Sequence, residues 1–170
     1  MPINSQIAKI LWLPTIAISL LANSCSSKYE GYSHKNGIYY KLITIGDTIN
    51  LPHAGDFVTT QLRYATITDS TFFSGNRTFQ LTEPEFKGSI DECFLMLSVG
   101  DSASFIIDAE KFFLKTLQCQ MPSFFKQGDK IKIDIRMNDI RSEEQYRRDK
   151  EEFLKWIEDF GEYEKLVLRN

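Results

Sequence analysis

The sequence is poor in the residues that build metal centres and disulfide frameworks. Its 170 residues contain two histidines and three cysteines, too few for a dedicated zinc site or a dense disulfide scaffold. Positive charge is also scarce, because 20 basic residues face 23 acidic ones and leave a net charge of −3. Proteins that bind nucleic acid through phosphate contacts are normally basic. We therefore expect no metal, no cofactor and no nucleic-acid partner.

The motifs of polar catalysis are missing as well. The sequence has no glycine-rich phosphate loop and no Ser/His/Asp order with a plausible base. The acid pairs Asp91-Glu92 and Glu143-Glu144 are interpreted as solvated helix starts, because adjacent helix residues point apart and acids complement the helix dipole there. Cys93 and Cys119 leave two alternatives open, a disulfide or two free thiols.

The chain has one apolar run, and it is short. The run extends for about 13 residues from Ile10 to Ala22 after the cation Lys9, whereas a helix that crosses a bilayer needs about 20 residues. A polytopic membrane protein is therefore excluded. A cation, a short apolar stretch and then small residues are typical of a secretory signal.

Cys25 follows Leu21-Ala-Asn-Ser, which resembles a bacterial lipobox, where the cysteine receives a diacylglycerol and becomes the first mature residue. The alternative is a plain signal with an incidental cysteine. We predict a lipoprotein signal peptide over 1–24, lipidation at Cys25 and a polar tether over 25–37. Several acyl chains anchor a protein firmly without a spanning helix. The expected location is the bacterial cell envelope, lipid-anchored in the outer membrane and facing the periplasm.

Alternation of apolar and polar side chains predicts a sheet. Segments 57–64 and 130–137 alternate with a period of two, which indicates strands with one buried face. Segment 89–97 has helical spacing and a capping-box pattern at its start. Further strands are expected over 38–45, 78–81 and 102–107, and a loop of about twenty residues precedes 130. This order predicts an α+β domain over 38–141, in which a bent antiparallel sheet wraps one short helix.

A second capping-box pattern, Ser142-Glu-Glu-Gln145, opens a charged helix that extends to about Leu168. We treat 142–170 as a separate C-terminal element. Packing on its own sheet or a spacer role is the default, while dimerisation and a helix-mediated partner remain alternatives. One stripe of this helix is apolar and consists of Tyr146, Phe153, Ile157, Phe160 and Val167.

Short motifs follow one another between Gly55 and Ile140. They are Gly55-Asp-Phe-Val-Thr, Asp69-Ser-Thr-Phe-Phe-Ser74, Phe79-Gln-Leu81, Phe86-Lys-Gly88 to Gly100-Asp101, Ala103-Ser-Phe-Ile-Ile107, Met121-Pro122 and the strand 130–140. In chain order and spacing these motifs resemble FKBP-type peptidyl-prolyl cis-trans isomerase domains, and Phe86 to Asp101 is the clearest match. The lipobox and the charged C-terminal helix are similar to those of FKBP-like lipoproteins of Bacteroidetes-type bacteria.

The resemblance implies a membrane-anchored isomerase that assists the folding of exported, proline-containing polypeptides. Rotation about an X–Pro amide meets a barrier of ~18–20 kcal/mol from the partial double bond. No bond breaks, so no nucleophile, metal or cofactor is needed. The catalyst must bind the twisted amide better than either planar form. An aromatic-lined cleft with one or two hydrogen-bond donors suffices, and 13 phenylalanines supply the material.

The resemblance also assigns residues to roles. It gives three catalytic residues: Phe73 as the cleft phenylalanine, Phe86 as the residue whose backbone N–H holds the ligand carbonyl, and Phe113 in place of the loop tyrosine. It gives Leu62 or Tyr64 for the tyrosine of the first strand. Each apolar residue could instead be core. The expected substrate-binding residues are Leu62, Tyr64, Phe79, Ile90 in place of the pocket-floor tryptophan, and Ile133 at the back of the cleft.

Three departures from the family pattern define the alternative function. Ser74 stands in place of the family's aspartate, Phe113 lacks the tyrosine hydroxyl, and Ile90 is smaller than tryptophan. Each lost donor costs about 0.5–1.5 kcal/mol, or up to roughly tenfold in rate. The alternative is therefore a catalytically degenerate domain that binds polypeptide as a chaperone or assembly module.

Overall fold

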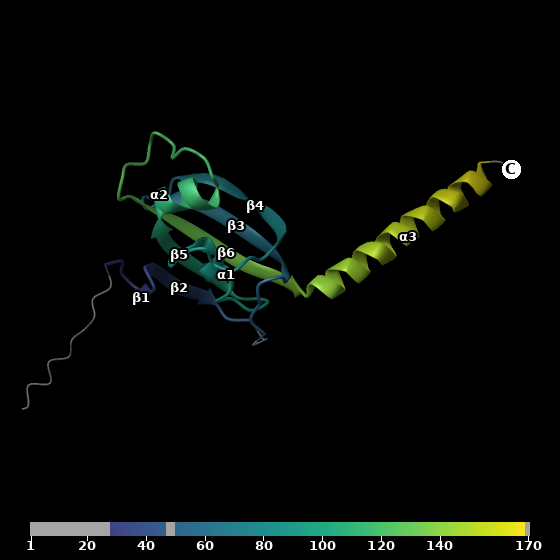
Figure 1. Ribbon diagram of the computed structural model, residues 1–170, viewed down its shortest axis with the longest axis horizontal. Coiled ribbons are helices and arrows are strands. Elements are labelled where there is room, and N and C mark those ends of the chain that lie inside the picture. The colour runs from purple at the N-terminus through teal and green to yellow at the C-terminus, as the bar shows by residue number, and fades with distance from the viewer. Residues whose placement is uncertain (1–27, 47–49, 169–170) are drawn as a thin grey trace, which may run out of the picture.

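A six-stranded sheet forms the body of the computed structural model, which describes residues 28–46 and 50–168 (Figure 1). All neighbouring strands are antiparallel, in the order β1-β2-β5-β6-β3-β4. The helical elements are α1 (Ile90–Phe94), α2 (Ala109–Lys111), a π-helical turn (Phe112–Thr116) and α3 (Glu143–Val167). The strands are β1 (Ser33–Lys35), β2 (Ile38–Thr44), β3 (Phe57–Thr66), β4 (Thr71–Gln80), β5 (Ser102–Asp108) and β6 (Lys130–Arg141).

One face of the sheet packs on α1 and forms the core. The predicted alternation on β6 is confirmed, because Ile131, Ile133, Ile135 and Met137 are all buried. On β3 the inward residues join the same cluster, and α1 contributes its own apolar face to it. Burying such side chains is the main favourable contribution to folding. The predicted α+β class, with a bent antiparallel sheet wrapped on one short helix, is confirmed.

The first strand lies where the sequence predicts a tether. Residues 33–35 pair with β2, and the turn between the two strands is Asn36-Gly37, with both residues at positive φ (53° and 86°). Asn-Gly is the preferred two-residue connection of a hairpin because its twist matches that of the strands. The tether prediction for 25–37 is therefore wrong for residues 33–35, and the turn signal outweighs the polar composition.

Two other boundaries differ from the prediction. Strand β4 begins at Thr71 rather than at residue 78, because cross-strand pairing with β3 continues through the polar stretch and Gly75. The expected loop before β6 contains α2 and the π-helical turn, which begin at the Asp108 cap. Asp108 accepts a hydrogen bond from the Lys111 backbone N–H at 3.0 Å, and this cap stabilises the start of α2.

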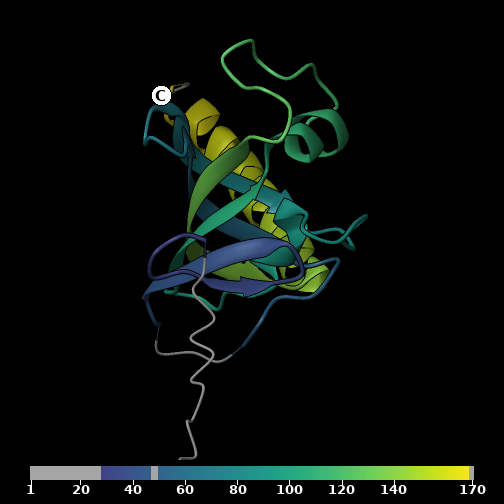
Figure 2. The same cartoon turned by 90° about the vertical axis from the view of Figure 1, so that its left-hand side faces the viewer.

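The helix α3 begins at the predicted capping box. The Ser142 side chain accepts from the Gln145 backbone N–H at 3.2 Å, and the Gln145 side chain accepts from the Ser142 N–H at 3.0 Å. The helix then extends away from the domain (Figure 1), and in the view turned by 90° it lies behind the sheet (Figure 2). It stays in contact near its start, where Tyr146 stacks on Phe57 with ring centroids 3.8 Å apart. Packing along its own sheet therefore does not describe this helix beyond its first turns.

The N-terminal predictions are outside the part of the chain that the structure describes. The expected signal peptide and Cys25 both fall in residues 1–27. Among the described helices, none combines the length and the apolar character needed to cross a bilayer. The alternatives for the other two cysteines are resolved, because Cys93 is a buried free thiol and Cys119 an exposed one.

Candidate functional site

A hollow of about 300 Å³ opens between β3, β4, α1 and the π-helical turn. Its walls are mostly apolar, and its position between the sheet and the short helix is the one expected for a peptide cleft. Small-molecule and peptide-segment pockets begin near this size. The lining residues are Leu62, Tyr64, Arg77, Thr78, Phe79, Ile90, Asp91, Phe94, Phe112, Thr116 and Leu117.

Aromatic rings build one wall of this hollow. Tyr64 on β3 lies 4.9 Å from its cross-strand neighbour Phe73 and meets Phe112 edge-on at 5.2 Å. Phe79 meets Phe94 edge-on at 5.0 Å on the other side. Such edge-to-face and tilted contacts hold rings in fixed positions. The wall is therefore preorganised around the Tyr64 ring.

The Tyr64 phenol is the polar group set into this aromatic wall. Burial raises the pKa of Tyr64 to about 12, and the nearby Arg77 charge opposes that rise. The phenol is therefore neutral at physiological pH and keeps its proton for donation. A half-buried O–H surrounded by rings is suited to donate a hydrogen bond to a bound carbonyl.

Two charged side chains lie at the rim. The guanidinium of Arg77 lies over the Phe73 ring, 4.9 Å from its centroid. Burial raises the pKa of Asp91 above its usual range. The sequence does not predict a site role for Arg77, because its strand is expected to begin later. The interpretation of Asp91 as a solvated helix start misses its position in the lining of the hollow.

Four of the predicted substrate-binding residues line the hollow. They are Leu62, Tyr64, Phe79 and Ile90. The resemblance offers Leu62 and Tyr64 as alternatives for one family position. Both line the hollow, because they are inward-facing residues of β3, two positions apart. The roles themselves stay predictions, because the structure holds no ligand.

The predicted catalytic residues Phe73 and Phe86 lie beside the hollow rather than in its lining. Phe73 supports the Tyr64 ring. Phe86 lies before α1, where its carbonyl accepts from the Ser89 N–H and its ring lies under the Lys115 ammonium at 5.1 Å. Among the described residues, the Phe86 backbone N–H donates no hydrogen bond, so it is available to a ligand carbonyl.

Phe113 and Ile133 are both in the core rather than at the hollow. Phe113 packs on Phe125 at 5.4 Å and does not line the hollow. Phe112, its neighbour, is buried as well, but its ring reaches Tyr64 and lines the hollow. Consecutive residues of a helical turn point in different directions, so only one phenylalanine of the pair reaches the hollow. The sequence Phe-Phe alone does not predict which of the two rings faces the hollow. Ile133 is fully buried on β6, which lies between β3 and β5 in the sheet.

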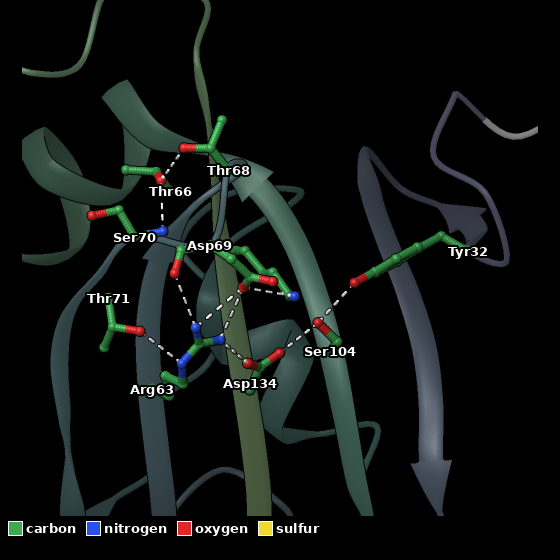
Figure 3. A network of polar contacts seen from close by, with 10 residues as sticks. Tyr32, Arg63, Thr66, Thr68, Asp69, Ser70, Thr71, Ser104 and Asp134 are labelled. Atoms are coloured by element: carbon green, nitrogen blue, oxygen red, sulfur yellow. Dashed lines mark hydrogen bonds and ion pairs between the residues drawn. The ribbon is translucent and has the colours of Figure 1, made fainter.

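The far face of the sheet carries a polar network centred on Arg63 (Figure 3). Its guanidinium donates to Asp134 at 2.7 Å and to Asp69 at 3.1 Å. Asp134 also accepts from Ser104, which in turn accepts from Tyr32 at 2.8 Å. The network joins the chain before β1 to β5, β6 and the β3–β4 turn. Its charges are paired, because Arg63 binds both Asp69 and Asp134. The network therefore has a structural role.

Ser74 lies on this far face as well. It pairs with Arg63 across β3 and β4 and lines a smaller hollow of about 220 Å³ there. A side chain on this face cannot serve the aromatic hollow, because successive strand residues point to opposite faces. Ser74 therefore does not take the place of the family's aspartate in the aromatic hollow.

The cysteine on α1, Cys93, is buried, and burial raises the pKa of its thiol well above the usual range. A buried neutral thiol is a poor nucleophile. Within residues 28–46 and 50–168, no group of three or more histidine, cysteine or acidic side chains is placed to hold a metal ion. The arrangement can bind an apolar segment and donate hydrogen bonds to it.

The fold matches solved structures of bacterial isomerases. One is FkpA from Escherichia coli, with a TM-score of 0.54 and 16% identity, over 68% of this chain and 54% of that chain. Another is a peptidyl-prolyl cis-trans isomerase from Pseudomonas syringae pv. tomato, with a TM-score of 0.52 and 14% identity, over 68% and 84%. The chain thus matches about half the length of FkpA. Neither the protein-family models nor the curated proteins match this sequence. The chain has the α+β fold of FKBP-type peptidyl-prolyl isomerases.

Proposed function

We propose that this protein is an FKBP-type peptidyl-prolyl cis-trans isomerase. The observation that carries the proposal is a preorganised apolar hollow with one neutral phenol, that of Tyr64, in its aromatic wall. The substrate class is an extended polypeptide whose X–Pro bond enters the hollow. The proline ring contacts the apolar walls formed by Phe79, Ile90 and Phe112.

The chemistry follows from the twisted amide. Rotation localises the nitrogen lone pair and lowers the polarity of the carbonyl, so a dry apolar site favours the twisted form over the planar ones. The Tyr64 hydroxyl and the Phe86 backbone N–H supply donors that fix the flanking carbonyls. Each tenfold gain in rate requires ~1.4 kcal/mol of preferential binding to the twisted form.

The same proposal places the protein on a membrane, assisting exported chains as they fold. It rests on the sequence of residues 1–25, where a short apolar run precedes Cys25. Replacing Cys25→Ser tests this part separately. A lipidated protein moves from the membrane to the soluble fraction on replacement, whereas an unchanged distribution contradicts the anchor.

The second candidate is a degenerate domain that binds polypeptide without turnover. It is favoured by one finding: the three family positions that depart from the pattern place no additional donor in the hollow, since Ser74 faces the other side, Phe113 is core and Ile90 is aliphatic. Both candidates use the same hollow and differ in rate alone.

A refolding assay separates the two candidates. The substrate is a protein whose refolding is limited by a trans-to-cis proline step, which takes tens to hundreds of seconds without catalysis. An isomerase shortens that slow phase in proportion to its concentration. Suppressed aggregation with an unchanged slow phase would establish the second candidate, and neither effect from a folded protein would remove both.

A further inference from the structure

The helix α3 displays an aromatic face that its own domain leaves uncovered. Side chains of Phe153, Trp156, Phe160 and Tyr163 are exposed by 57%, 59%, 55% and 65%. Three of the rings form a continuous strip, with Phe153–Trp156 and Trp156–Phe160 centroids 6.1 and 5.6 Å apart. Leaving several large rings in water is unfavourable, and an apolar strip of this kind marks an interaction surface.

The spacing of this strip is that of a coiled-coil seam. From Phe153 to Val167 the apolar residues of the strip recur at alternating intervals of three and four: 153, 156, 160, 163 and 167. A repeat averaging 3.5 residues keeps one face of a helix against a partner helix along its length. A helix packed on a sheet or lying alone has no need of it.

We propose that α3 pairs with α3 of a second copy of this chain, as an antiparallel two-stranded coiled coil centred near Glu158. In this register Phe153 faces Tyr163 of the second copy and Trp156 faces Phe160. The register uses the free part of the seam. Tyr146, the preceding seam position, is already stacked on Phe57 of its own domain and lies outside the paired segment.

Charge complementarity selects the antiparallel direction. Flanking the seam, Lys150 faces Glu164 of the second copy at both symmetric positions. These two attractive pairs outweigh the one repulsive contact of this register, which Asp159 makes with Asp159 of the second copy near the centre. Ion pairs along the described part of α3 use other residues, so both groups are available. A parallel pair would instead bring Asp159 against Glu164 twice, which is repulsive.

The direction also suits the domains. Each helix begins about 15 residues from the centre, or ~22 Å at 1.5 Å per residue. The two domains therefore lie at opposite ends of the pair, with each hollow open to substrate. Parallel pairing would crowd both domains at the start of the helices, where Tyr146 already contacts Phe57.

The composition of α3 argues against a lipid surface as its partner. Interfacial helices have polar faces rich in Lys and Arg, which anionic headgroups attract. Within Glu143–Val167, nine acidic side chains outnumber five basic ones. The strip is therefore better covered by a second α3, whose charges match it, than by an anionic bilayer.

Sedimentation equilibrium of the full chain in a density-matched detergent tests the pairing. We expect a monomer–dimer equilibrium, which Phe153→Glu weakens by at least about tenfold. Leu154→Glu is the matched control, because Leu154 has nearly the same exposure (55%) but lies off the seam. A monomer at all concentrations, or equal effects of the two substitutions, would overturn the proposal. Sedimentation with anionic vesicles of a protein that stays monomeric would assign the strip to lipid and also overturn it.

A charge exchange tests the direction without disturbing the apolar strip. Lys150→Glu places two acids opposite each other and weakens the antiparallel dimer, and adding Glu164→Lys restores it. In a parallel dimer Glu164→Lys alone strengthens the pair, because it removes the repulsion from Asp159. Recovery in the double variant supports the proposal, and strengthening by the single Glu164→Lys contradicts it.

Discussion

The phenol ring of Tyr64 lies 4.9 Å from the ring of Phe73, its partner across β3 and β4. This contact holds the Tyr64 ring, which carries the hydroxyl of the aromatic wall, against β4. The motif that includes Phe73 on β4 resembles the isomerase family. Phe73 supports Tyr64 from the side, and Phe112 meets it edge-on at 5.2 Å. The hydroxyl is thus positioned by side chains, and its role in rotation of an X–Pro bond is the basis of the following predictions.

Replacing Tyr64→Phe tests the donor directly. The ring contacts remain, while the hydrogen bond to the substrate is lost, at a cost of about 0.5–1.5 kcal/mol. We expect the isomerase rate to fall by about three- to tenfold, with thermal stability nearly unchanged. A protease-coupled peptide assay gives the rate. Tyr40→Phe, on β2 and away from the hollow, is the control, and equal rates for the two variants would refute the assignment.

The titration of Tyr64 gives a stability signature at high pH. Its pKa is raised from 10.0 to about 12 in the fold by burial. The folded state therefore holds this proton more tightly than the unfolded state, so the contribution is complete below pH 10 and is lost as the pH rises through 12. Denaturation in urea between pH 9 and 12 should show a fall in stability that Tyr64→Phe reduces. An identical fall in the variant would show that Tyr64 titrates normally.

Phe112 and Phe113 are both buried, but only Phe112 also lines the hollow. Replacing either with leucine removes a buried ring and costs roughly 1–2 kcal/mol of stability. Phe112→Leu also changes the wall against Tyr64 and should lower the isomerase rate, whereas Phe113→Leu should leave it unchanged. Steady-state rates, measured where both variants are fully folded, make the comparison. A loss of rate confined to Phe113→Leu would restore the position that the family resemblance indicates.

The two described cysteines should differ sharply in reactivity. Cys93 is buried and its pKa is raised well above the usual range by burial, whereas Cys119 is exposed. A thiol reagent should label Cys119 within minutes and reach Cys93 only after denaturant is added. Mass spectrometry of the labelled peptides distinguishes the sites. Rapid labelling of Cys93 in the native protein would mean that this face of α1 is not buried in the core as described.

Much of the fold could be predicted from the sequence because apolar and polar side chains alternate along its strands. The β6 pattern places Ile131, Ile133, Ile135 and Met137 inward in sequence and in structure, because a half-buried strand must present one apolar face. The capping box at Ser142 likewise locates the start of α3. β1 was missed, although Asn36-Gly37 is a hairpin signal, because its strand is three residues long and polar.

The site was less readable, for reasons of geometry. Leu62, Tyr64, Phe79 and Ile90 could be placed because inward positions of a strand or helix face share one side. Phe112 was missed because the sequence of two consecutive phenylalanines does not indicate which of them reaches the hollow. Arg77 was missed because a charged residue on a strand is ordinarily solvated, and only its contact with the Phe73 ring reveals the rim position.

Exchange NMR on a short X–Pro peptide tests the central claim most directly, because it reports rotation without a coupled protease. The account predicts that the wild-type chain accelerates cis–trans exchange. It predicts that Thr116→Trp, which fills the hollow, abolishes the effect, while Ser123→Trp on the exposed part of the same loop leaves it intact. Exchange at the uncatalysed rate in the presence of folded wild-type protein, or equal acceleration by both tryptophan variants, would contradict it.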